Sequence, residues 1–161
     1  MSKVEARLEQ LGLTLPPALE PPPGLILPFK PVIVHGDRVY ISGHAPQAAD
    51  GTLAGPFGKV GSDLSIEQGV EAARQVGLSI LGDLKRALGD LDRVTAWLRV
   101  LGMVNVAPGF NMTTPIINGF SELIVELYGP EQGAHTRSAV GMAVLPLDIP
   151  VEIEAEVAIS G

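Results

Sequence analysis

The 161-residue sequence predicts an α+β fold, in which a β-sheet carries two helices on one of its faces. Three observations lead to this prediction. Two long segments repeat apolar residues at helical spacing, five shorter segments are rich in β-branched residues, and the segments follow the order β-β-α-β-α-β-β. The sequence shows no internal repeat, and its length suits a single domain.

Residues 1–27 are predicted to form a short helix and a proline-rich arm, which precede the main domain at 28–161. Ser2 is suited to cap a helix over residues 2–11, whose apolar residues fall on one stripe. The prolines between 16 and 24 exclude helix and are poor in sheet. We therefore expect this arm to lie extended along the surface.

The main domain is predicted to begin with a β-hairpin. Residues 32–34 and 39–41 are β-rich, and the four residues between them are typical of a tight turn. The stretch 43–63 contains five glycines without any periodicity. We expect this stretch to be a loop.

The first long helix is predicted from Ser65 to Gly89. Ser65 and Gln68 form the S-x-x-Q pattern of a capping box, and apolar residues then recur at helical spacing up to the glycine. A glycine inside a helix costs about 1 kcal/mol relative to alanine. Three such glycines are present: Gly69, Gly77 and Gly82. We expect these small residues to allow close packing onto the sheet.

The remaining elements are predicted in the second half of the chain. Residues 94–106 are apolar on both faces, which indicates a central strand. A helix from about 115 to 127 follows, and Gly129 ends it. Two strands, 138–144 and 151–159, complete the sheet, and a six-residue connection joins them.

One face of the sheet is predicted to need a partner. The last strand alternates apolar residues with Glu152, Glu154 and Glu156, which places three acids on the face away from the helices. A row of like charges is usually a solvated surface. The strand at 94–106 is nevertheless apolar on both faces, and an exposed apolar sheet face is normally covered by another subunit. We therefore expect a homo-oligomer with any functional cleft between chains.

Composition and motifs exclude several classes of function. The net charge of −7 and the aromatic content of 4% are unsuited to nucleic acid binding, and no apolar run is long enough for a membrane span. No cysteine is available as a metal ligand or nucleophile. His35, His44 and His135 lack metal-ligand spacing, and no Walker loop, dinucleotide fingerprint or G-x-S-x-G elbow is present. We expect a cytoplasmic protein with no signal peptide, metal, cofactor or nucleic acid partner.

The end of the chain carries a distinctive pattern: Arg137-Ser138, then Leu145-Pro146, then the strand 151–155. Upstream, residues 36–43 have the form G-x-x-x-(aromatic)-x-S-G, and Asn118 precedes the aromatic residue of the second helix. Together these motifs resemble those of the RidA family, also called the YjgF/YER057c/UK114 or L-PSP endoribonuclease family.

The resemblance covers about residues 28–159, and the N-terminal helix and arm are typical of a divergent branch. It implies a chorismate-mutase-like fold assembled as a homotrimer, with three clefts between subunits. It also implies hydrolysis of reactive enamines and imines, such as 2-aminoacrylate from pyridoxal-phosphate enzymes, to 2-keto acids and ammonia. The implied partner is a small carboxylate-bearing substrate.

By this resemblance, Arg137 and Glu152 are the catalytic residues. The planar guanidinium of Arg137 suits a bidentate grip on the substrate carboxylate. Glu152 would activate water or protonate nitrogen if partial burial raises its pKa. The other substrate contacts are assigned to Ser42, Asn118, Ala139 and Phe29, the last of which stands where the family often has tyrosine.

A hairpin register for the last two strands separates these catalytic residues. With a turn centred on 145–150, Glu152 faces Ala143 and Arg137 faces Ala158, which places the two side chains about 20 Å apart at 3.3 Å per residue. They would share a ligand only if they came from different chains. The alternative is that Arg137 forms an interface ion pair with a glutamate of the last strand.

Several alternatives stay open in the sequence. His44 stands where an amide is usual, and we expect a surface loop histidine rather than a pocket base. The same fold also suits a non-catalytic protein that binds or senses small keto or amino acids. An endoribonuclease ranks below both readings because of the negative charge, and a chaperone-like role is left open.

Overall fold

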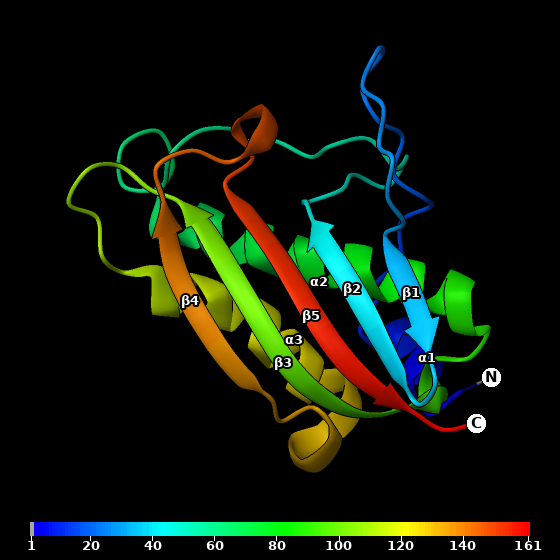
Figure 1. Cartoon of the computed structure of the whole chain (residues 1–161). Coiled ribbons are helices and arrows are strands. Elements are labelled where there is room, and N and C mark those ends of the chain that lie inside the picture. The colour runs from blue at the N-terminus through cyan, green and yellow to red at the C-terminus, as the bar shows by residue number, and fades with distance from the viewer. Residues whose placement is uncertain (1) are drawn as a thin grey trace.

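The computed structural model describes residues 2–161 and confirms the α+β fold class (Figure 1). A five-stranded sheet carries α2 and α3 on one face, and from β1 onward the helices and strands follow the predicted order. The helices are α1 (Lys3–Gln10), α2 (Ile66–Leu88) and α3 (Thr113–Gln132); the strands are β1 (Val32–His35), β2 (Arg38–His44), β3 (Val94–Asn105), β4 (Thr136–Met142) and β5 (Val151–Ile159). Among residues 2–161, no helix is both long and apolar enough to cross a membrane.

The N-terminal helix is present as predicted and packs into the common core. Ser2 caps it, and the carboxylate of Asp92 accepts hydrogen bonds from the amides of Lys3 and Val4 at 2.7 and 3.0 Å. These contacts satisfy amides that a helix start otherwise leaves unpaired. Val4 and Leu8 are buried and belong to the same hydrophobic core as residues of α2, α3 and the sheet.

The turns and caps expected from the sequence are also confirmed. His35 pairs with Arg38 across the β1–β2 turn, and Ser65 and Gln68 form the capping box of α2. Gly89 follows α2 and Gly129 interrupts α3, both with a left-handed backbone conformation. Each rests on a local rule that needs no tertiary information.

The glycines of α2 face the neighbouring helix and the arm, and the expectation that they pack onto the sheet is wrong. A Cβ atom at Gly77 would lie 2.8 Å from Leu123 of α3, and one at Gly82 would lie 2.9 Å from the carbonyl oxygen of Pro16. Both distances are shorter than van der Waals contact allows. The glycines therefore let α3 and the arm approach the α2 backbone.

The predicted hairpin of the last two strands is wrong. The sheet order is β1-β2-β5-β3-β4, so β3 lies between β4 and β5. Val100 of β3 pairs with Arg137 in the parallel strand β4 and with Ala155 in the antiparallel strand β5. The β4–β5 connection passes over the end of β3, where the Asn105 amide donates to the Pro150 carbonyl at 2.9 Å. The connection, residues 143–150, thus spans an intervening strand.

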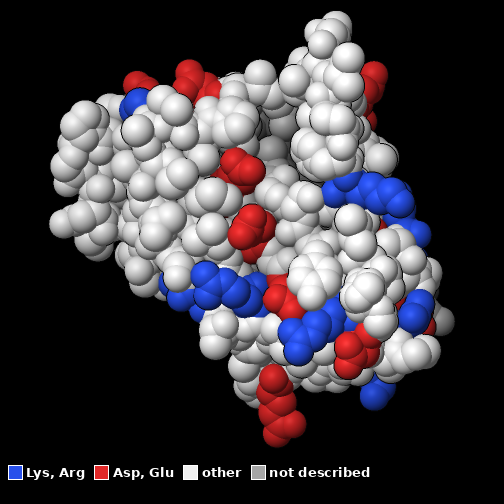
Figure 2. All heavy atoms as spheres, viewed as in Figure 1, with Lys and Arg blue, Asp and Glu red and all other residues white. Residues whose placement is uncertain are grey.

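The two faces of the sheet differ as the alternation in β5 predicts. Its apolar residues are buried under the helices, whereas Glu152, Glu154 and Glu156 point to the other face, on which Figure 2 shows acidic groups flanked by basic ones. Apolar side chains are also uncovered there: Ile33 is 51% exposed and Tyr40 48% exposed. We call this side the open face.

Candidate functional site

The structure divides the six predicted site residues between two places. Three lie where β4 packs on α3: Arg137, Asn118 and Ala139. Two line a cavity beyond the end of β2, Glu152 and Phe29, and Ser42 lies beside it. We call the cluster of Arg137, Asn118 and Ser121 the arginine site, and the cavity next to Glu152 the acid cavity.

In the arginine site, three acceptors from α3 hold the guanidinium of Arg137. Its Nη1 donates to Asn118 Oδ1 at 3.0 Å and to Ser121 Oγ at 2.9 Å, and its Nη2 donates to the Thr114 carbonyl at 3.3 Å. A guanidinium has five N–H donors. Within residues 2–161, Nε–H and one Nη2–H have no partner, so two donors remain for a ligand. The Ala139 carbonyl already accepts a hydrogen bond from the first residue of α3 at 3.1 Å.

The sequence motifs did not indicate Ser121 as a site residue, nor His135, which contacts Ser121. His135 Nδ1 donates to the Gly133 carbonyl at 2.7 Å, which leaves Nε2 to accept the Ser121 hydroxyl at 2.9 Å. Burial lowers the pKa of His135, and the charge of Arg137 acts in the same direction. The three-residue spacing of Asn118 and Ser121, which puts both on one helix face, could have revealed the serine.

The acid cavity has a volume of about 590 Å³ and lies between the end of β2, the start of β5, the β4–β5 connection and the arm. It opens as the hollow beside the arm in Figure 2. Burial raises the pKa of Glu152, the negative charge of Glu154 adds to this effect, and His44 opposes it. A carboxyl group with a raised pKa is suited to both give and take protons.

Gly43 makes room for the carboxyl group of Glu152. A Cβ atom at this position would overlap Glu152 Oε1. A β-bulge between Ile41 and His44 inserts one extra residue into β2 relative to β5. The bulge breaks the inward–outward alternation and turns His44 toward the helices.

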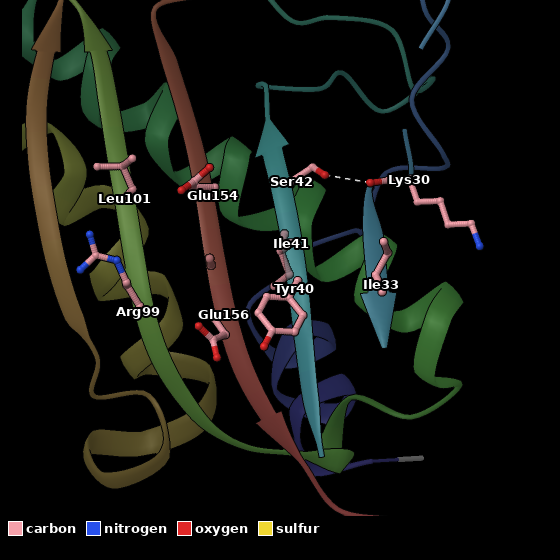
Figure 3. A pocket seen from close by; sticks show the side chains of 10 residues that line it. Lys30, Ile33, Tyr40, Ile41, Ser42, Arg99, Leu101, Glu154 and Glu156 are labelled. Carbon is pink, nitrogen blue, oxygen red and sulfur yellow. Dashed lines mark hydrogen bonds between the residues drawn. The ribbon is translucent and has the colours of Figure 1, made fainter. Parts of the chain in front are cut away.

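Ser42 lies outside the acid cavity. Its hydroxyl donates to the Lys30 carbonyl at 2.8 Å, on the wall of a neighbouring hollow of about 290 Å³ (Figure 3). Tyr40, Arg99 and Glu154 line the same hollow on the open face. The hydroxyl predicted to bind substrate is thus engaged within its own chain.

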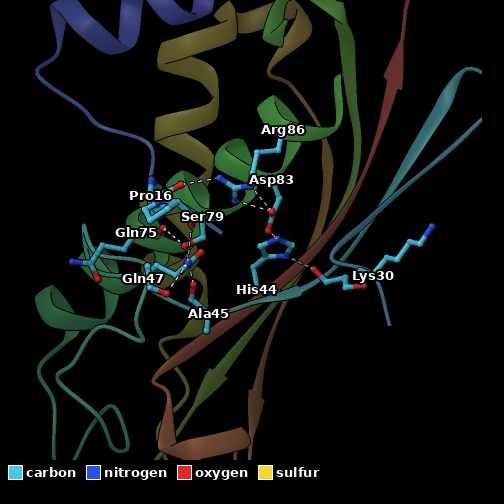
Figure 4. Close-up of polar contacts among 12 residues, drawn as sticks. Pro16, Lys30, His44, Ala45, Gln47, Gln75, Ser79, Asp83 and Arg86 are labelled. Atoms are coloured by element: carbon cyan, nitrogen blue, oxygen red, sulfur yellow. Dashed lines mark hydrogen bonds and ion pairs between the residues drawn. The ribbon is translucent and has the colours of Figure 1, made fainter. Parts of the chain in front are cut away.

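The expectation of a surface histidine at position 44 is wrong. His44 is only 7% exposed, with Nδ1 2.6 Å from the Ser42 carbonyl and Nε2 3.0 Å from Asp83 Oδ2 (Figure 4). Both partners are hydrogen-bond acceptors, and the contact with Asp83 is an ion pair when the ring is protonated. Burial opposes ionisation of Asp83, but hydrogen bonds from His44 and Arg86 outweigh it and hold its pKa below the usual value.

Arg137 and Glu152 do not meet within one chain. Val100 pairs with both Arg137 and Ala155, and Glu152 lies three residues before Ala155, which places the two Cα atoms about 14 Å apart by standard strand spacings. Arg137 contacts the helices, whereas Glu152 points to the open face. Within residues 2–161, no group of three or more His, Asp or Glu residues is placed to hold a metal ion.

Comparisons with known proteins agree with this architecture. A family model described as "YjgF/chorismate_mutase-like, putative endoribonuclease" matches residues 5–154. Protein TCP17 of Trypanosoma cruzi is 35% identical over 153 residues, which cover 95% of this chain and 92% of that protein.

Solved structures show the same fold. Atu1372 from Agrobacterium tumefaciens, a protein of unknown function, is 36% identical with a TM-score of 0.87, over 98% of this chain and 93% of that chain. The structure of E. coli TdcF with bound serine is 23% identical with a TM-score of 0.59, over 89% of this chain and 98% of that chain. The similarity to TdcF is one of fold alone. From the family model and its relatives, this chain belongs to the YjgF/chorismate mutase-like family, which confirms the resemblance to RidA proteins.

Proposed function

We propose that this protein hydrolyses reactive enamines and imines of the 2-aminoacrylate type to 2-keto acids and ammonia, at clefts between the subunits of a homotrimer. The observation that carries the proposal is the separation of Arg137 from Glu152 on opposite faces of the sheet. Each half has chemistry that the reaction needs, and a second chain is required to bring the halves together. Family membership supports the type of reaction.

The arginine site would hold the carboxylate of the substrate. Arg137 has two donors without a protein partner, and a carboxylate accepts two parallel N–H bonds from a guanidinium. Because Asn118 and Ser121 already fix the guanidinium, less side-chain freedom is lost when the substrate binds.

Glu152 would carry the proton transfers. Its carboxyl group protonates the terminal carbon of 2-aminoacrylate and so forms the iminium. The resulting carboxylate takes a proton from water as the water oxygen bonds to the iminium carbon. Glu152 then protonates the amino nitrogen, the C–N bond breaks to release ammonia, and the hydroxyl proton returns to Glu152. The raised pKa of Glu152 supports this alternation between acid and base.

The apolar side chains on the open face are an argument for contacts between subunits. Ile33 and Tyr40 expose about half of their surface there, and Leu101 of β3 lines the same hollow. Apolar patches of this kind are normally buried in an interface. Glu152 points to the same face, so a subunit that covers it would border the acid cavity.

A second candidate function is binding without turnover. Phe29 lines the acid cavity without a hydroxyl group, and the structure of E. coli TdcF holds serine. RNA cleavage, which the family description mentions, is disfavoured because a net charge of −7 repels phosphate.

A coupled assay tests the proposal. A pyridoxal-phosphate lyase generates 2-aminoacrylate, and keto acid formation is followed with wild type, Arg137→Ala and Glu152→Gln. The control is Arg74→Ala, which removes an arginine from a surface ion pair with Glu126 at 3.4 Å. Acceleration by wild type and the control, but not by the two site variants, is expected. Saturable keto acid binding by a wild type that gives no acceleration would favour the binding protein.

A further inference from the structure

The acid cavity is larger and more apolar than a three-carbon substrate requires. Its volume of about 590 Å³ lies in the range of pockets that enclose drug-sized ligands. Its charged groups are Glu152, His44 and Asp83, which come from β5, β2 and α2. Apolar side chains from the arm and the β4–β5 connection form the opposite walls: Leu19, Leu25, Leu27, Phe29, Leu147 and Ile149.

The arm that builds one wall is fixed to the body of the protein. The Pro16 carbonyl accepts a hydrogen bond from Arg86 Nη1 at 3.0 Å, and the Glu20 amide donates to the Gly51 carbonyl at 3.0 Å. Arg86 also holds Asp83, so the arm is tied to the charged side of the cavity. Prolines further restrict the conformations of this segment.

Alternate residues of the arm face the cavity. Leu25, Leu27 and Phe29 line it and are 42%, 38% and 57% exposed, whereas Ile26 is 82% exposed and is not part of the wall. An extended chain turns successive side chains to opposite sides, which explains the alternation. A ligand with an apolar side chain would remove these surfaces from water.

We propose that the acid cavity binds 2-imino acids, and their 2-oxo acid products, that carry branched aliphatic or aromatic side chains. The polar head lies at Glu152 and the side chain lies against the arm. The reaction in this inference rests on the proposed function, but the preference for an apolar side chain rests on the cavity walls alone.

Calorimetry with two oxo acids tests the preference without requiring turnover. 4-Methyl-2-oxopentanoate should bind at least about tenfold more tightly than pyruvate, since single methylenes change affinity in hydrophobic pockets by about that factor. Leu27→Asn should weaken the binding of 4-methyl-2-oxopentanoate more than that of pyruvate, and so bring the ratio of the two affinities toward one. Ile26→Asn also replaces an aliphatic side chain of the arm by an amide, but outside the cavity wall, and it should leave the ratio of the two affinities as in wild type.

Turnover separates this inference from the proposed function. An L-amino-acid oxidase supplies the imines of leucine and alanine, and oxo acid release is measured with and without the protein. A binding preference without any turnover supports the cavity assignment and contradicts the deaminase. Turnover of the alanine imine with equal binding of both oxo acids contradicts the cavity assignment alone, and so does an Ile26→Asn effect as large as that of Leu27→Asn.

Discussion

The carboxyl group of Glu152 lies directly against the backbone of Gly43, where the bulge in β2 turns His44 toward the helices. A Cβ atom at position 43 would overlap Glu152 Oε1. The position of the proposed acid therefore depends on the absence of a side chain on the neighbouring strand.

Gly43→Ala should lower kcat by about 10- to 100-fold, because a displacement of about 1 Å at a reacting group has an effect of this size. The keto acid assay measures it. Glu152→Asp withdraws the carboxyl group from Gly43, so Gly43→Ala should have much less effect in that background. Equal losses in both backgrounds would show that Gly43 does not act through Glu152.

The rate should fall on the alkaline side as Glu152 loses its proton, with a midpoint above the ordinary glutamate value, since burial raises its pKa. The charged groups near this carboxyl are Glu154 of β5, His44 of β2 and, behind His44, Asp83 of α2. Glu154→Gln removes a negative charge, lowers the pKa of Glu152 and should move the alkaline limb to lower pH.

His44→Gln should move the same limb in the opposite direction. It removes the positive charge that opposes the raised pKa of Glu152, so the protonated form should persist to higher pH. The kcat–pH profiles of both variants check these shifts. Displacement of both profiles in the same direction would contradict the assignment of the limb to Glu152.

Asp83→Asn should lower the free energy of unfolding by about 3 kcal/mol at neutral pH, because it removes the buried carboxylate that contacts both His44 and Arg86. The pKa of Asp83 is lowered in the folded state, so its stabilisation is present above the unfolded pKa and is lost as pH falls through the folded one. Urea unfolding should show that the difference in free energy of unfolding between wild type and Asp83→Asn becomes smaller from neutral to acid pH. A difference that does not change with pH would contradict a stabilising role of the Asp83 carboxylate.

Asn118→Ala should raise KM by about tenfold and change kcat little, since it removes one hydrogen bond that orients the Arg137 guanidinium. Asn111→Ala, at an exposed position before α3, is the matched control. A loss confined to kcat would place Asn118 in the chemical step instead.

The elements of the fold could be predicted because their signals are local. The capping box at Ser65 and the turn at Gly36 depend on a few adjacent residues, and both are present. The pairing of β4 with β3 could not be predicted this way. The six-residue connection predicted between the last two strands is compatible with a hairpin. In the structure β3 lies between β4 and β5, and this arrangement rules the hairpin out.

The sequence supplied candidate site residues but could not give their arrangement in the fold. Arg137 and Glu152 were found by motif, and the bulge that buries His44 leaves no signal in the alternation of β2. The apolar wall at Leu25 and Leu27 depends on where the arm folds back, which is set by contacts with the distant Arg86 and Gly51. Such contacts between remote segments are invisible to periodicity.

The central claim is that two chains build each site, and mixing two inactive variants tests it most directly. Arg137→Ala and Glu152→Gln are unfolded together in equal amounts, refolded and assayed for keto acid formation. If the site is shared between chains, random assembly should restore about a quarter of the wild-type activity, since that fraction of interfaces pairs an intact arginine with an intact glutamate. If both residues act within one chain, every site keeps one defect, and a mixture as inactive as its components would contradict the claim.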